Sequence, residues 1–120
     1  MLTKAQHLTK ATDNETLVTQ QDLSIGICAD WSVTFLFYSA VHYVEAYFST
    51  RGIRHKMHKT RNSAIARDQL LRGVYDAYRE LQELSRDSRY ERPTGSFTAL
   101  DVEYLQGCLE TIKQAVLPMM

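Results

Sequence analysis

A cluster of cationic and imidazole side chains follows the most apolar segment of this chain and could act on a phosphodiester. The cluster contains Arg51, Arg54, His55, His58 and Arg61. Histidine can transfer protons near neutral pH because its unperturbed pKa is about 6.5. Arginine suits a phosphate because its planar guanidinium can donate two hydrogen bonds to it. His58 with Arg51 or Arg61 would therefore supply the proton transfer and charge stabilisation that RNA cleavage without a metal requires.

Three more polar side chains could belong to the same site. Asn62 follows Arg61 and could hydrogen-bond a phosphate or a base, or could cap a helix. His42 and Glu45 are three residues apart, so on a helix they share one face. They could support the site, or they could satisfy each other or an arginine inside the fold. The expected phosphate-binding and supporting side chains are Arg54, Arg61, Asn62, His55, Glu45 and His42.

The sequence indicates neither a bound metal nor a disulfide. His55 and His58 have the spacing His-x-x-His, but no second cluster of His, Cys or Asp completes a metal shell. We expect no metal and no cofactor. Cys28 and Cys108 are expected to be free thiols, since nothing else in the sequence indicates an oxidising compartment.

The charge of the chain is balanced in sum and uneven in distribution. The 120 residues carry 14 basic and 14 acidic side chains, and 44% of the residues are hydrophobic. This length and composition predict one domain over residues 1–120. The zero net charge of the chain does not by itself favour nucleic acid as a partner. However, every charged residue in the segment 46–67 is Lys or Arg. One basic segment therefore lies in an otherwise balanced or acidic chain.

Hydrophobic periodicity and caps predict helices only. We expect helical segments over residues 3–21, 31–52, 61–67 and 70–86, and a last helix that begins at Thr98. Asp30 is expected to cap the second helix, and Thr98 with Asp101 resembles a capping box for the last one. No run alternates like a strand. The predicted fold class is all-α, a four- to five-helix up-and-down bundle.

The segment 31–50 is long enough to span a bilayer, but it carries His42 and Glu45. A charged group in mid-span is costly in lipid, so a buried core helix in a cytoplasmic protein is expected instead. A helix that is apolar nearly all round has to be central. The other helices of so short a chain are not expected to cover it fully, which favours a homodimer.

The stretch from Asp30 to Tyr47, with its His42 and Glu45, resembles the long second helix of the HEPN domain superfamily. Gly52-Ile53, then His58 and Arg61-Asn62, match the turn and basic segment that follow this helix in small stand-alone members. The segment 84–90 also resembles one that precedes their final helix. The resemblance covers residues 5 to 116 approximately.

This resemblance implies a bundle that is usually dimeric and that serves one of two roles. Many HEPN proteins are metal-independent endoribonucleases of toxin–antitoxin and other defence systems, and others are nucleotide-binding or partner subunits beside nucleotidyltransferases. The ribonucleases carry Arg, four to six residues, then His. Arg51 and His58 are separated by six residues, with Gly52 where a polar residue is usual, whereas Arg54 is too close to His58.

The irregular spacing and neutral charge favour a nucleic-acid- or nucleotide-directed binding or adaptor module. The alternatives are an endoribonuclease that uses His58 with Arg51 or Arg61, and a purely structural homo-oligomer.

Overall fold

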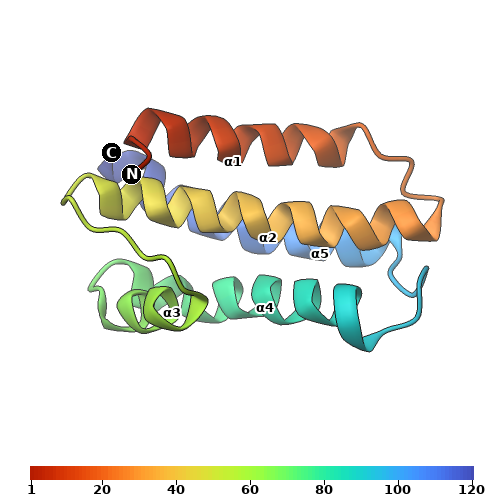
Figure 1. The fold of residues 1–120 in the computed structure, drawn as a ribbon. Helices are drawn as coiled ribbons and strands as arrows, with labels where there is room; N and C mark the ends of the chain where they lie inside the picture. Colours follow the sequence, from red (N-terminus) through yellow and green to blue (C-terminus); the bar gives the residue numbers. More distant parts are fainter.

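The chain forms five α-helices, and the computed structural model describes all 120 residues (Figure 1). The α-helices are α1 (Lys4–Thr19), α2 (Gly26–Ser49), α3 (His58–Arg67), α4 (Tyr75–Arg86) and α5 (Ala99–Val116). Three short helical segments join or end them: η1 (Leu71–Val74), the π-helical η2 (Asp87–Glu91) and η3 (Leu117–Met119). The predicted all-α bundle is confirmed.

The helices run up and down around α2. Figure 1 shows α1, α2 and α4 side by side with alternating directions, α5 behind α2, and the short α3 beside the start of α4. Both chain termini lie at the end of the bundle where α2 finishes. The loop that joins α2 to α3 carries Arg51, Arg54 and His55, and α3 carries His58 and Arg61. This arrangement brings the basic cluster back against the side of α2.

The core is built on α2. Its fully buried side chains Leu36 and Phe37 pack with those of Tyr78, Leu81 and Leu105 from α4 and α5. Burying one such side chain contributes about 1.5–3 kcal/mol relative to leaving it in water. The apolar segment 31–50, which is long enough to cross a membrane, thus lies in the central helix of the fold. None of the helices is both long enough and apolar enough to cross a bilayer.

One stripe of α2 is left uncovered, as the shortness of the chain led us to expect. Ile27, Trp31 and Tyr38 expose 49%, 50% and 39% of their surface. These residues recur at helical spacing, so they lie along one line of α2 between α1 and α4. The homodimer that would cover such a stripe stays a prediction.

Asp30 does not cap α2, contrary to the expectation from sequence. The helix begins one turn earlier, at Gly26. The Asp30 carboxylate instead accepts hydrogen bonds from the backbone N–H groups of Gly95 and Phe97, at 2.6 and 3.3 Å. It therefore holds the loop before α5 against the first turns of α2. Thr98 and Asp101 form the predicted capping box at the start of α5.

Candidate functional site

Glu45 on α2 fixes the basic loop to the bundle. Its buried carboxylate accepts hydrogen bonds from the backbone N–H of His55 at 2.8 Å and from the ring Nδ1 of His55 at 2.9 Å. The guanidinium of Arg61 lies 3.7 Å from the same carboxylate. A buried carboxylate is costly unless it is paired and hydrogen-bonded. The structure thus brings together Glu45, His55 and Arg61, three of the residues selected from sequence.

Arg61 extends this network to His58. Its side chain is buried, its Nη2 donates to the backbone carbonyl of His55 at 2.8 Å, and its Nη1 lies 3.1 Å from Nδ1 of His58. A guanidinium has donors only, so Nδ1 of His58 has to accept this hydrogen bond. The ring proton of neutral His58 is therefore on Nε2, which leaves an N–H donor available on the other side of the ring.

The surroundings of His58 keep its ring neutral. The ring packs against Phe37, with 5.5 Å between the ring centroids. Partial burial, and then the positive charges of Arg61 and Arg89, lower the pKa of His58 below its usual value of 6.5. The Nε2–H group of His58 thus suits the binding of an anion such as a phosphate oxygen.

Arg51 does not join this network. Its Nη2 lies 2.7 Å from a carboxylate oxygen of Asp68, and its guanidinium covers the ring of Tyr47 at 4.8 Å. The hydroxyl of Tyr47 also donates to Asp68. Arg51 therefore helps to hold the end of α2 against the end of α3, and Arg61 is the arginine that contacts His58.

Asn62 joins α3 to α4. In one of its two amide orientations, both the oxygen and the nitrogen of the side chain have hydrogen-bond partners. In that orientation the oxygen lies 2.7 Å from Nη1 of Arg79, and the nitrogen donates to the carbonyl of His58 at 3.0 Å. The side chain is neither a helix cap nor free to bind a ligand. Its effect on the site is indirect, since it holds the first turn of α3.

His42 pairs with His7 of α1, which is not among the residues selected from sequence. The two Nδ1 atoms are 3.0 Å apart, so one ring donates and the other accepts. Burial, followed by the neighbouring His7, lowers the pKa of His42 to about 4, and burial also lowers the pKa of His7. Both rings are therefore neutral at pH 7, and the pair links α1 to α2 beside the site.

Three exposed cations border the network and form what we call the cationic rim: Arg54, Lys56 and Lys59. None of them forms an ion pair. The charge of Arg54 also contributes to the lowered pKa of His7, which indicates that the rim and the histidine pair share one electrostatic environment. Three unpaired cations on the α2–α3 loop and the first turn of α3 give this end of the bundle a concentration of positive charge.

Arg89 is a second residue that sequence reasoning assigned no role. It belongs to the π-helical segment η2, and its guanidinium lies over the rings of Tyr38 and Tyr90 at 5.8 and 5.5 Å. The only available signal was its place in the segment that resembles HEPN proteins. Its charge acts on His58, so the positive surface extends along α2 toward η2.

No group of three or more His, Cys, Asp or Glu side chains is placed to hold a metal ion. Both cysteines are free thiols. Comparison of this chain with protein-family models, with curated proteins and with solved structures finds no match.

Proposed function

We propose that this protein is a binding module for RNA or nucleotides, with the character of a non-catalytic HEPN-like domain. In this proposal the cationic rim and the Nε2–H of His58 bind phosphate groups. The observation that carries the proposal is the hydrogen bond from Arg61 to Nδ1 of His58. It holds His58 as a neutral donor, in the same basic segment as the three unpaired cations of the rim.

The same hydrogen bond makes the alternative, an endoribonuclease, a poorer fit. To act as a general base, His58 needs a free electron pair on Nε2, which requires a proton on Nδ1 facing the donors of Arg61. To act as a general acid, it needs to be an imidazolium, which Arg61 and Arg89 both disfavour. Arg51, the other proposed catalytic residue, is engaged by Asp68. In a purely structural homo-oligomer, the cationic rim would serve only to keep an exposed surface soluble, and the Nε2–H of His58 would have no role.

The resemblance to HEPN proteins supplies the biological setting of the proposal. Such a module would act as an adaptor in a toxin–antitoxin system or beside a nucleotidyltransferase-type partner. These parts of the proposal rest on the sequence pattern between Asp30 and Tyr90.

The proposal is tested by measuring the affinity of the purified protein for a fluorescently labelled single-stranded RNA over a range of salt concentrations. Lys56→Gln combined with Lys59→Gln should weaken binding and reduce the slope of log affinity against log salt by about 1.4. The matched control is Arg72→Gln with Arg86→Gln, which removes two exposed charges on η1 and α4 and should leave both quantities unchanged. A nucleoside triphosphate as competitor separates nucleotide binding from RNA binding. Absence of binding to either ligand would refute the proposal.

A further inference from the structure

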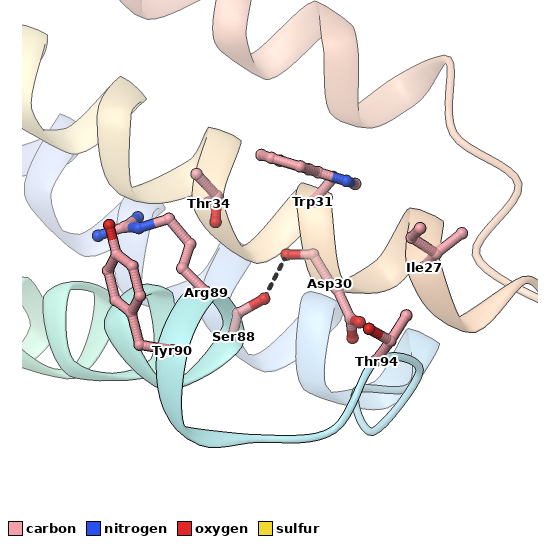
Figure 2. Close-up of a pocket in the computed structure, with 8 residues that line it drawn as sticks. All are labelled: Ile27, Asp30, Trp31, Thr34, Ser88, Arg89, Tyr90 and Thr94. Carbon is pink, nitrogen blue, oxygen red and sulfur yellow. Dashed lines mark hydrogen bonds between the residues drawn. The ribbon is translucent and has the colours of Figure 1, made fainter.

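A hollow beside the His58 network is lined by aromatic, hydroxyl and guanidinium groups. It has a volume of about 330 Å³, and Figure 2 shows its lining, which comes from the first half of α2, from η2 and from the loop that follows η2. Its principal side chains are Trp31, Thr34, Ser88, Arg89 and Tyr90. A volume of this size is at the lower end of the range for small-ligand sites.

The hollow is held open by interactions between segments far apart in the sequence. The hydroxyl of Ser88 donates to the backbone carbonyl of Asp30 at 2.9 Å, which fixes η2 against α2 (Figure 2). The Asp30 carboxylate fixes the following loop through the N–H groups of Gly95 and Phe97. A side chain at Gly26 would meet the backbone of Gly95 at 2.6 Å, so α2 and this loop are in direct backbone contact. The hollow is therefore a built feature of the fold.

Two aromatic rings of the hollow are free for a ligand. Trp31 exposes half of its surface and Tyr90 exposes 75%. On α2, the indole of Trp31 lies near the ring of Phe35, with 6.3 Å between the centroids. Exposed aromatic rings stack on nucleobases with little regard to base identity, because every base has a π face.

The polar groups of the hollow match the rest of a nucleotide. Arg89 donates a hydrogen bond to the hydroxyl of Ser85 and forms no ion pair. It lies over the ring of Tyr90, where its other N–H groups can contact a phosphate. The hydroxyl of Thr34 is buried and has no hydrogen-bond partner. Figure 2 shows this hydroxyl directed toward Arg89 and Ser88. A buried hydroxyl without a partner is costly, and a polar edge of a bound base would satisfy it.

Arg89 also connects the hollow to the candidate site. It lies over the ring of Tyr38, and its charge contributes to the lowered pKa of His58. A strand of RNA with one base in the hollow would thus run along a positive path toward His58 and the cationic rim. This continuity favours an RNA base over an apolar peptide side chain, which would leave the hydroxyl of Thr34 without a partner and would make no use of the charge of Arg89.

We propose that this hollow binds one unstacked nucleobase of single-stranded RNA, between Trp31 and Tyr90, with Arg89 on the adjoining phosphate. The inference rests on the proposed function, because the base in the hollow belongs to the same RNA whose phosphates the cationic rim binds. It names a base-binding subsite that is separate from the His58 network.

The chain contains a single tryptophan, so the emission of Trp31 reports on this hollow alone. A labelled single-stranded RNA of about eight nucleotides is titrated with the protein for affinity, and the unlabelled RNA is titrated into the protein for Trp31 emission. Stacking of a base should quench the emission, and tripolyphosphate should not. Tyr90→Ala should weaken RNA binding by about 5- to 100-fold and reduce the quenching, whereas Tyr90→Phe should behave like the wild type. Tyr104→Ala, which removes an exposed aromatic ring from α5, is the matched control and should change nothing.

The outcomes separate this inference from the proposed function. RNA binding without quenching, and with no effect of Tyr90→Ala, would overturn the base-binding subsite and leave the cationic rim in place. Absence of RNA binding by the wild-type protein would overturn both. A Trp31 emission that depends on protein concentration, together with a dimer in sedimentation, would show that a second copy occupies the hollow, and would also overturn the inference.

Discussion

Arg61 donates a hydrogen bond to Nδ1 of His58, at 3.1 Å, and this contact decides what the histidine can do. The arginine is itself held by the carbonyl of His55 and by the carboxylate of Glu45. It cannot give up its proton or rotate toward solvent without breaking this network. His58 is therefore presented to solvent as a neutral donor through Nε2, and the chemistry of the site follows from that protonation state.

The first prediction concerns the pKa of His58. Because the positive charge of Arg89 contributes to lowering this pKa, Arg89→Gln should raise it toward 6.5. The measurement is a titration of the His58 ring signals by NMR, in which the wild-type protein should show the Nε2–H form at pH 7. Arg86→Gln removes a nearby charge that does not act on His58 and is the control. An unchanged pKa in Arg89→Gln would place Arg89 too far from His58 to link the hollow to the site.

The second prediction concerns the buried carboxylate. Glu45→Gln removes the negative charge that compensates Arg61 and weakens the hydrogen bonds from His55. Breaking a buried pair in this way should lower the free energy of unfolding by about 2–4 kcal/mol. Urea unfolding followed by circular dichroism measures the effect. Glu83→Gln breaks only an exposed ion pair with Arg79 and should cost less than about 1 kcal/mol. Equal effects of the two substitutions would contradict the anchoring role of Glu45.

Local signals in the sequence predicted the helices, and contacts between distant residues decided the site. The capping box of Thr98 and Asp101 involves neighbours only, so its pattern was sufficient. Asp30 looks like a cap, but its carboxylate binds a backbone N–H 65 residues away, which no local pattern reveals. Arg51 and Arg61 are both arginines near His58 in the sequence, and the sequence alone does not show which of them contacts it. Which of them contacts His58 depends on Asp68 and Glu45, whose positions only the fold determines.

The base-binding hollow was beyond sequence reasoning for the same reason. From sequence, the helix that contains Trp31 is expected to be central and covered on every side, because it is apolar nearly all round. The structure exposes half of Trp31 and places η2 beside it, in a segment that follows the predicted fourth helix. The π-helical turn is what presents Arg89 and Tyr90 to this side of α2, and such turns occur frequently at functional sites.

The third prediction concerns stability at acid pH. In the folded protein the pKa of His42 is lowered to about 4, while in the unfolded chain it is near 6.5. The unfolded state therefore binds more protons between these values, so stability is complete above pH 6.5 and is lost as the pH falls toward 4. After allowance for solvent screening, we expect a loss of about 2 kcal/mol from His42 over this window. Lys10, Arg61 and Arg54 oppose protonation of the His7–His42 pair and Glu45 favours it.

The measurement for this third prediction is the free energy of unfolding at several pH values between 4 and 7, for the wild type and for His42→Gln. The variant should be less stable at pH 7, because it loses the contact with His7, and should show a shallower decline toward acid pH. His55→Gln removes a histidine outside the pair and serves as the control for the loss of one imidazole. Parallel curves for wild type and His42→Gln would show that the pair does not set the acid sensitivity.

The fourth prediction compares two arginines that the sequence placed in the same site. Arg51 is paired with Asp68, whereas Arg54 is exposed and unpaired. Arg54→Gln should therefore weaken RNA binding and reduce its salt slope by about 0.7, with little change in stability. Arg51→Gln should leave the RNA affinity within about twofold and lower the free energy of unfolding by up to about 1 kcal/mol, since its ion pair is partly exposed. Fluorescence anisotropy at several salt concentrations and urea unfolding measure the two quantities on the same samples. If Arg51→Gln abolished RNA binding, the ligand would have to displace Asp68, and Arg51 would return to the site beside His58.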